Sequence, residues 1–168
     1  MKITKSRNFR DLTAAGAPGQ QSIRTGMLLR SAHLDNLDND EKREIHSLGI
    51  KTIIDFRRTE EQLTPIPEGL EHVSMVHIPI GDVKHDDKKI KKTPNGKVDL
   101  GSLMAANEMI DIDQLWIKTC DRYEEKIIKY RDELVQAVSV CTDIKRLPVL
   151  FHCVGGKDRT GILGACRT

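Results

Sequence analysis

Short apolar runs separated by polar, turn-forming segments recur along the chain. They lie at 27–29, 51–56, 71–80 and 148–151. The last three have the length of strands, and the run at 71–80 alternates apolar and polar positions as a half-buried strand does. Asp38 and Glu41 are spaced as in a capping box, which predicts a helix that begins there and ends near Gly49. Strands and helices in this order predict an α/β fold with a mainly parallel central sheet flanked by helices.

A second periodicity begins near Asp113. Apolar or aromatic side chains recur every three or four residues, at Trp116, Cys120, Tyr123, Ile127, Tyr130, Leu134, Ala137 and Cys141. This spacing places them on one face of a helix. Long stripes of this kind also occur in coiled coils, but beside a predicted sheet we expect one helix, or two consecutive helices, that face the core.

Composition narrows the class of protein. The 168 residues are enough for one domain, and we expect a single domain over residues 1–168. Charged residues make up 31% of the chain but the net charge is only +2, so bulk charge does not indicate a nucleic-acid or membrane partner. The segment from Met1 to Gly16 lacks the apolar stretch of a signal peptide, and no apolar run reaches the ~18 residues of a transmembrane helix. We expect a soluble, cytoplasmic protein whose four irregularly spaced cysteines are reduced.

One segment differs in composition from the rest of the chain. Residues 84–97 hold six lysines and two aspartates together with Pro94, Asn95 and Gly96, and Ile90 is the one aliphatic residue among them. This composition predicts a solvated loop inserted into the domain. Its lysines would also suit a basic lid that attracts anionic substrates or lipid head groups, and the sequence leaves both interpretations open.

The segment from His152 to Gly161 carries the strongest indication of chemistry. It reads His-Cys-Val-Gly-Gly-Lys-Asp-Arg-Thr-Gly, follows a short apolar run and precedes residues suited to a helix. Gly155 and Gly156 allow the backbone to curl, so that successive amides converge on one anion at the start of the helix. The planar guanidinium of Arg159 binds two phosphoryl oxygens at once. We therefore predict a phosphate-binding loop formed by Val154, Gly155, Gly156, Lys157, Asp158 and Arg159.

The same loop would activate a cysteine. A thiol at a helix N-terminus beside cationic groups is stabilised as the thiolate, so we expect Cys153 to be an ionised nucleophile at neutral pH. Its sulfur would attack phosphorus and form a phosphocysteine that water then hydrolyses, while the amides and Arg159 stabilise the transition state. The Thr160 hydroxyl would donate to the sulfur and make it a better leaving group. This chemistry requires no metal or cofactor, and the four cysteines lack the spacing of a zinc site.

The segment from His152 to Gly161 resembles the signature of the protein tyrosine phosphatase superfamily. Its Gly-Lys-Asp-Arg-Thr-Gly form is similar to the bacterial and fungal tyrosine and dual-specificity phosphatases that also accept phosphoinositides. Three further segments resemble that family in the same order, at 8–12, 29–31 and 49–57. The resemblance covers nearly the whole chain. It implies a metal-independent phosphatase acting on phosphotyrosine in proteins, with phosphoserine, phosphothreonine or phosphoinositides as further substrates.

The resemblance also gives two candidates, Asp82 and Asp158, for the general acid that protonates the leaving group. Asp82 follows the apolar run at 71–80, so a strand would carry it to the edge of the sheet. Asp158 lies inside the phosphate-binding loop. A carboxyl in an anionic, partly desolvated site stays protonated to higher pH, so both are chemically suitable and the choice stays open. Lys157 would add positive charge for multiply phosphorylated substrates.

The chain departs from the family pattern at its C-terminus. Only nine residues follow Arg159, where the family usually continues with a long helix, so we expect a shortened C-terminal helical part. A catalytically impaired phosphate-binding fragment, or pseudophosphatase, is therefore the alternative function. A rhodanese-like sulfur carrier also uses a cysteine loop after a strand, but the arginine, threonine and glycine at the loop exit argue against it. Other polar residues near predicted strand ends are expected to be structural, namely Arg10, Asp11, Asp55, Arg57 and His152.

Overall fold

A computed structural model describes residues 8–12, 24–35, 37–63, 69–81 and 112–166 of the chain. The chain divides into two compact units, one formed by Met1–Gly81 with Lys129–Thr168 and the other by Asp82–Ile128. Of the second unit the structure describes only part of one helix. The general-acid candidate Asp82 and the lysine-rich segment 84–97 lie outside the described residues.

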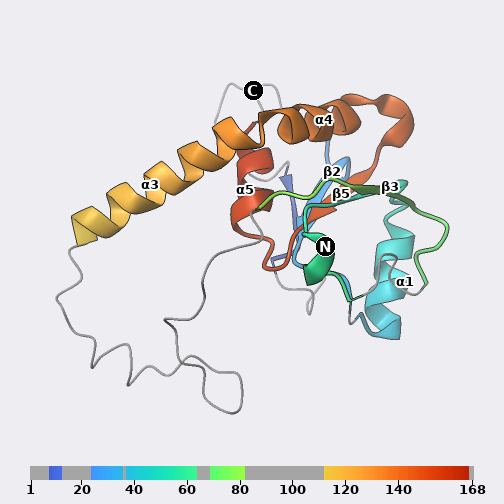
Figure 1. The fold of residues 1–168 in the computed structure, drawn as a ribbon. Coiled ribbons are helices and arrows are strands. Elements are labelled where there is room, and N and C mark those ends of the chain that lie inside the picture. The colour runs from blue at the N-terminus through green and yellow to red at the C-terminus, as the bar shows by residue number, and fades with distance from the viewer. Residues whose placement is uncertain (1–7, 13–23, 36, 64–68, 82–111, 167–168) are drawn as a thin grey trace, which may run out of the picture. The chain divides into compact units, whose positions relative to one another are not determined.

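The first unit is built on a five-stranded sheet in the order β1-β2-β5-β3-β4. Its strands are β1 (Arg10–Asp11), β2 (Leu28–Ser31), β5 (Val149–His152), β3 (Thr52–Asp55) and β4 (Ser74–His77). β1 is antiparallel to β2, and all other neighbours are parallel. The predicted α/β fold with a mainly parallel sheet is therefore confirmed (Figure 1).

β4 is shorter than the strand predicted at 71–80. A backbone hydrogen bond from the Val73 N–H to the Leu70 carbonyl closes a turn before it. After it, the N–H groups of Ile78 and Ile80 still donate to the carbonyls of Asp55 and Phe56, at 3.0 and 3.1 Å. The regular pairing of β4 with β3 covers four residues on each strand.

One face of the sheet packs against α1 (Asn39–Ser47). A row of apolar side chains crosses four strands on this face, with Leu29, Leu150, Ile53 and Met75 in register. Ile45 of α1 belongs to the same core cluster and is 1% exposed. Burial of side chains of this kind stabilises the fold by roughly 1.5–3 kcal/mol each.

The predicted start of α1 is confirmed in atomic detail. The Asp38 side chain accepts hydrogen bonds from the N–H groups of Asp40 and Glu41, at 3.0 and 2.9 Å. In return the Glu41 carboxylate accepts from the Asp38 N–H at 2.9 Å, which completes a capping box.

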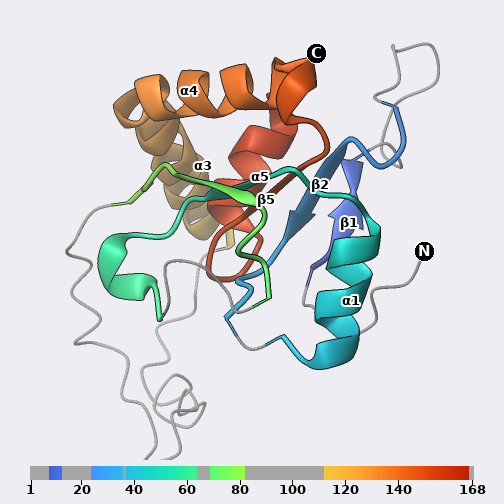
Figure 2. The same cartoon turned by 90° about the vertical axis from the view of Figure 1, so that its right-hand side faces the viewer.

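The opposite face of the sheet is covered by α4 (Arg131–Thr142) and α5 (Asp158–Ala165). Figure 2 shows the sheet between α1 on one side and these two helices on the other. The helices bury mainly small and branched apolar residues, namely Leu134, Ala137, Val140, Ile162 and Leu163. Both helices and β5 thereby fix the segment that follows β5.

The apolar stripe predicted from Trp116 to Cys141 lies on two helices. α3 (Ile112–Lys129) and α4 are separated at Tyr130, whose backbone leaves helical geometry. Leu134 in α4 is buried, as the core-facing prediction requires, whereas Trp116 and Ile127 on α3 are 70% and 47% exposed. Periodicity identifies an apolar face but does not identify what covers it.

β5 lies in the middle of the sheet, with β2 on one side and β3 on the other. Ser31, His152 and Asp55 are in register and end these three strands. Segments that leave the carboxyl ends of neighbouring parallel strands gather at one edge, where open α/β sheets bind ligands. No helix within the described ranges combines the length and apolar character needed to cross a bilayer.

Candidate active site

The loop that follows β5 turns tightly into α5. Its first residue, Cys153, is buried and only 5% exposed. Thr160, in the first turns of α5, is fully buried, and its hydroxyl donates to the Cys153 sulfur over 3.0 Å.

Gly156 allows the loop to touch the backbone that follows β2. Its φ of +63° is in the left-handed region, which favours glycine. A Cβ at this position would lie 2.5 Å from the Ser31 carbonyl oxygen and 2.6 Å from the Ala32 nitrogen. Both atoms are backbone and cannot move aside, so no residue with a side chain fits at Gly156. Gly155, by contrast, has open space around it.

The Arg159 side chain extends from α5 towards η2, a short 3-10 helix at Thr59–Glu61. Its Nη1 and Nη2 atoms donate to the two carboxylate oxygens of Glu61, at 2.6 and 3.0 Å. Nη1 also donates to the Phe56 carbonyl oxygen at 3.4 Å. Each side chain of this pair is 17% exposed, so the two-point ion pair is largely shielded from water.

The Glu61 carboxylate stays ionised at all ordinary pH values. Burial raises its pKa, but hydrogen bonds from Arg159 and Arg58 outweigh that effect and lower the pKa from 4.5 to about 2. Burial likewise lowers the pKa of Arg159, but hydrogen bonding to Glu61 and the nearby negative charges, that of Glu61 first, together raise it by more. Because the folded pKa of Glu61 is depressed, the stability that this carboxylate contributes is present above pH 4.5 and is lost as the pH falls towards 2.

Glu61 occupies only one edge of the Arg159 guanidinium. The Nε–H and the outer N–H of Nη2 lie on the adjacent edge, a geometry that binds two phosphate oxygens side by side. Gly81 lies near the group, since a Cβ there would be 3.4 Å from Nη2 and 3.6 Å from Cζ and Nε. The two-point contact with Glu61 therefore orients this side chain.

A separate ion-pair network lies at the carboxyl end of β3. Arg57 is 1% exposed; its Nε donates to both Asp55 oxygens at 3.0 Å, and its Nη1 pairs with Asp35. Gln62 donates to Asp55 at 2.9 Å. Burial raises the pKa of Asp55, but the hydrogen bonds from Arg57 together with the charges of His152 and Arg57 lower it by more, so the carboxylate stays ionised. The network ties the segment after β2 to the segment after β3.

His152 precedes Cys153 and is fully buried. Its Nδ1 lies 3.8 Å from the Asp55 carboxylate. Burial nevertheless lowers the pKa of His152 from 6.5 to about 4, so the ring is neutral at neutral pH. A neutral, enclosed imidazole next to the candidate nucleophile fits a structural role better than that of a general base.

The burial of His152 predicts a pH-dependent stability. Between pH 6.5 and 4 the unfolded chain binds a proton that the folded chain excludes, so the free energy of unfolding falls as the pH drops through this window. The slope reaches about 1.4 kcal/mol per pH unit. Urea unfolding should show that the free energy of unfolding of the parent is lower at pH 5 than at pH 7. In His152→Gln this decrease should be smaller by about 1–2 kcal/mol.

His46→Gln is the matched control for this measurement. His46 lies on α1 and is exposed, so His46→Gln removes a histidine without disturbing the buried core. An equal loss of stability in His152→Gln and the parent would contradict a neutral buried imidazole.

The other predicted loop residues differ in exposure. Val154, Gly155, Lys157 and Asp158 are exposed, and Gly156 is buried. Asp158 is the first residue of α5, so of the two general-acid candidates the structure places this one directly beside the loop. No three His, Cys, Asp or Glu side chains converge on a possible metal position in the described part of the chain.

Three residues of this region were not identified as site residues from the sequence. Asn8 and Arg30 donate to carbonyl oxygens of the loop, and Glu61 holds Arg159. Asn8 and Arg30 lie in segments that resemble the phosphatase family. That resemblance is the sequence signal that points to them. Glu61 follows another glutamate, and nothing in the local sequence distinguishes the two.

Comparison with known proteins identifies relatives of this chain. The profile of the tyrosine phosphatase family matches residues 1–167. The chain is 27% identical to the triple specificity protein phosphatase PtpB of Mycobacterium tuberculosis, over 94% of this chain and 59% of that protein. It is 25% identical to a putative tyrosine-protein phosphatase of Cupriavidus necator, over 92% of this chain and 51% of that protein.

A third similarity is more local. An inositol diphosphatase of Arabidopsis thaliana is 32% identical over 44% of this chain and 36% of that protein. The chain spans about half the length of the two bacterial relatives, at 59% and 51%.

Proposed function

This chain belongs to the tyrosine phosphatase family, and from that premise we propose that it hydrolyses phosphate monoesters through a phosphocysteine intermediate. One observation carries the proposal. The buried Cys153 sulfur, its Thr160 donor and the oriented Arg159 guanidinium all belong to one short segment between β5 and α5. This segment supplies a nucleophile and a cation able to hold two phosphoryl oxygens.

The proposed reaction has two steps. The Cys153 thiolate attacks phosphorus, an S–P bond forms, and the bond from phosphorus to the leaving oxygen breaks as an acid donates a proton to that oxygen. Water then attacks phosphorus, the S–P bond breaks, and the Thr160 hydroxyl stabilises the departing thiolate through the hydrogen bond of 3.0 Å. In both steps Arg159 and the loop amides would stabilise the charge on the equatorial oxygens.

The acid in the first step is proposed to be Asp82 or Asp158. Asp158 begins α5 beside the loop, whereas Asp82 follows Gly81, the residue that lies against the Arg159 guanidinium. Asp158 is thus supported by its own position, and Asp82 by the position of the residue before it.

A pH profile of kcat distinguishes the two aspartates. Loss of the true donor should remove the basic limb of the profile and lower kcat by about 10²–10⁴-fold, because the leaving oxygen then departs unprotonated. Asp82→Asn and Asp158→Asn should be compared with Asp40→Asn, an exposed position on α1. If both variants keep the basic limb of the parent, neither aspartate is the acid.

The proposed substrates are phosphotyrosine in proteins and, in addition, phosphoserine, phosphothreonine or phosphoinositides. The name of the mycobacterial relative refers to triple specificity, and that of the plant relative to an inositol phosphate substrate. The exposed Lys157 at the loop supports this breadth, because a second cation favours multiply phosphorylated ligands. Competition between a phosphotyrosine peptide and a phosphoinositide head group in one assay would rank the two classes.

Release of inorganic phosphate from an aryl phosphate tests the proposal itself. The purified chain should turn this substrate over in the presence of a chelator. Binding of inorganic phosphate without any turnover would contradict the enzyme and support the alternative, a phosphate-binding module or pseudophosphatase.

A further inference from the structure

Four successive carbonyl groups of the loop are held by donors from outside it. The Val154 carbonyl accepts from the His33 N–H at 3.2 Å, and the Gly155 carbonyl accepts from the Asn8 side-chain amide at 2.7 Å. Nη2 of Arg30 donates to the next two carbonyls, those of Gly156 at 2.7 Å and Lys157 at 3.2 Å. The donors come from the N-terminal segment, from β2 and from the residues after β2.

These contacts determine where the loop amides point. In a trans peptide the N–H lies opposite the carbonyl of the preceding residue. The carbonyls of Val154 to Lys157 face the outside donors. The N–H group of the next residue in each case, from Gly155 to Asp158, therefore faces the other way. Within the described part of the chain, the N–H groups of Gly155, Gly156 and Lys157 donate to no other group.

We propose that Asn8 and Arg30 are positioning residues that hold the loop amides in a phosphate-binding orientation before any substrate arrives. The inference rests on the proposed function and extends it to residues outside the loop. Donors that are already oriented stabilise developing charge without the cost of reorganisation. Neither side chain needs to touch the substrate, since each acts through the peptide group that it holds.

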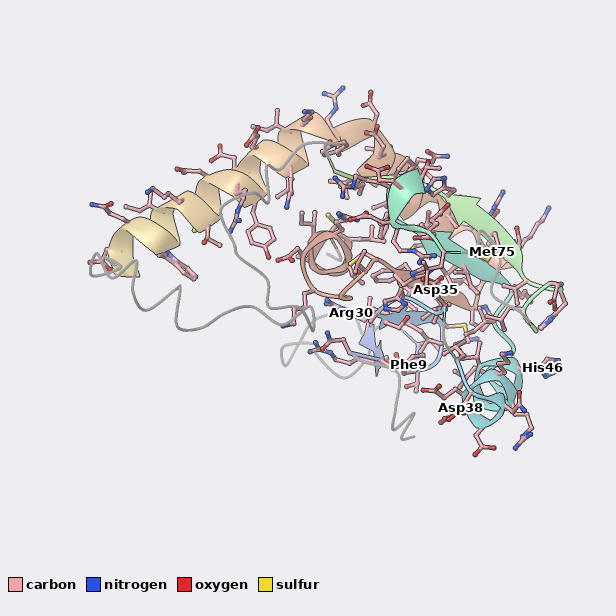
Figure 3. All side chains as sticks on the ribbon, turned by 60° about the horizontal axis from the view of Figure 1, so that its bottom comes forward. Phe9, Arg30, Asp35, Asp38, His46 and Met75 are labelled. Atoms are coloured by element: carbon pink, nitrogen blue, oxygen red, sulfur yellow. The ribbon has the colours of Figure 1, made fainter. Side chains whose placement is uncertain are left out.

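Arg30 is held in place for this role by α5. It lies on the face of β2 next to that helix, as Figure 3 shows. Gly164 and Gly161 lie beside its guanidinium, since Cβ atoms there would be at van der Waals distance, 3.4 Å from Nη1 and 3.8 Å from Nη2. The fixed charge of Arg30 on the outer side of the loop also favours an anion on the inner side.

The backbone conformation at position 8 suits asparagine. Its φ is +61°, a left-handed conformation that asparagine and glycine tolerate well. Two replacements therefore separate the amide donor from the backbone requirement. Asn8→Gly keeps the conformation and removes the donor, whereas Asn8→Asp keeps the shape but turns an acceptor towards the Gly155 carbonyl.

The test compares binding of inorganic phosphate, measured by calorimetry, in the parent, Asn8→Gly, Asn8→Asp, Arg30→Lys and Arg30→Met. We expect each single replacement of a donor to weaken phosphate binding by about tenfold, with Asn8→Asp weaker than Asn8→Gly and Arg30→Met weaker than Arg30→Lys. In an aryl phosphate assay kcat should fall by more than KM rises, because oriented donors act most strongly on the transition state.

Arg43→Met is the matched control. Arg43 lies on α1, is 73% exposed and pairs only with Asp40 among the described residues, so this variant should bind phosphate like the parent. Thermal unfolding of every variant identifies any that fails to fold, and the milder Arg30→Lys and Asn8→Gly then carry the comparison. Parental phosphate affinity in folded Asn8→Gly and Arg30→Lys would overturn the inference.

Failure of the inference and failure of the proposed function give different results. If the parent binds phosphate but does not hydrolyse the ester, and the variants bind more weakly, the positioning role stands and the proposed hydrolase activity fails. If the parent hydrolyses the ester and all folded variants match it in binding and in kcat, the positioning role is wrong and the hydrolase activity stands.

Discussion

Replacing Cys153 by serine is expected to abolish phosphate release, with a loss of at least about a thousandfold in kcat. A serine hydroxyl is not ionised near neutral pH, so it lacks the nucleophile that the thiolate provides. The substitution changes one atom in a buried position, and the Thr160 hydroxyl can still donate to the serine oxygen. The variant should therefore fold like the parent, and phosphate release from an aryl phosphate measures the loss directly.

Two further measurements separate loss of the nucleophile from loss of the site. Cys153→Ser should still bind inorganic phosphate, because Arg159 and the loop amides are unchanged. Cys166→Ser, at the exposed end of α5, should keep parental kcat. Turnover in Cys153→Ser within tenfold of the parent would show that the reaction does not proceed through this sulfur.

Arg159→Lys should have the second largest effect, a fall of about 10²–10³-fold in kcat/KM. A lysine ammonium is a single point charge and cannot present two donors to adjacent phosphoryl oxygens. It also cannot pair with both Glu61 oxygens, so the orientation imposed at 2.6 and 3.0 Å is lost. Steady-state kinetics on an aryl phosphate measure the effect.

Arg58 provides a closely matched control for Arg159. It pairs with the same Glu61 carboxylate through its side chain at 3.1 Å, but its backbone N–H makes a second bond that any replacement keeps. Arg58→Lys should therefore lower kcat/KM by less than about threefold. Equal losses in Arg58→Lys and Arg159→Lys would mean that general charge near Glu61, and not the two-point geometry of Arg159, supports the reaction.

The elements of this fold that follow from local sequence were predictable. The capping box of Asp38 and Glu41 determines where α1 starts, and the apolar run before His152 forms the buried strand β5. The order of strands was not predictable, because β5 enters between β2 and β3 from a distant part of the chain. The apolar face of α3 shows the same limit, since periodicity identifies such a face without identifying what it packs against.

The candidate site likewise contains residues that local sequence predicts and residues that it does not. Cys153, Arg159 and Thr160 lie close together in sequence, so their spacing alone indicated a phosphate-binding loop. Glu61 and Arg30 are 98 and 126 residues from the groups that they contact in the loop region. Their roles depend on which strand ends lie side by side, and that information is present only in the folded structure.

We propose that the loop after β5 binds an oxyanion beside the Cys153 sulfur and makes this sulfur a reactive nucleophile. Alkylation by iodoacetate at pH 6, followed residue by residue with mass spectrometry, tests both parts at once. Exposed Cys120 serves as the internal reference. Cys153 should react at least about tenfold faster than Cys120, and inorganic phosphate should suppress its reaction alone. Equal rates at the two cysteines, with no protection by phosphate, would contradict the account.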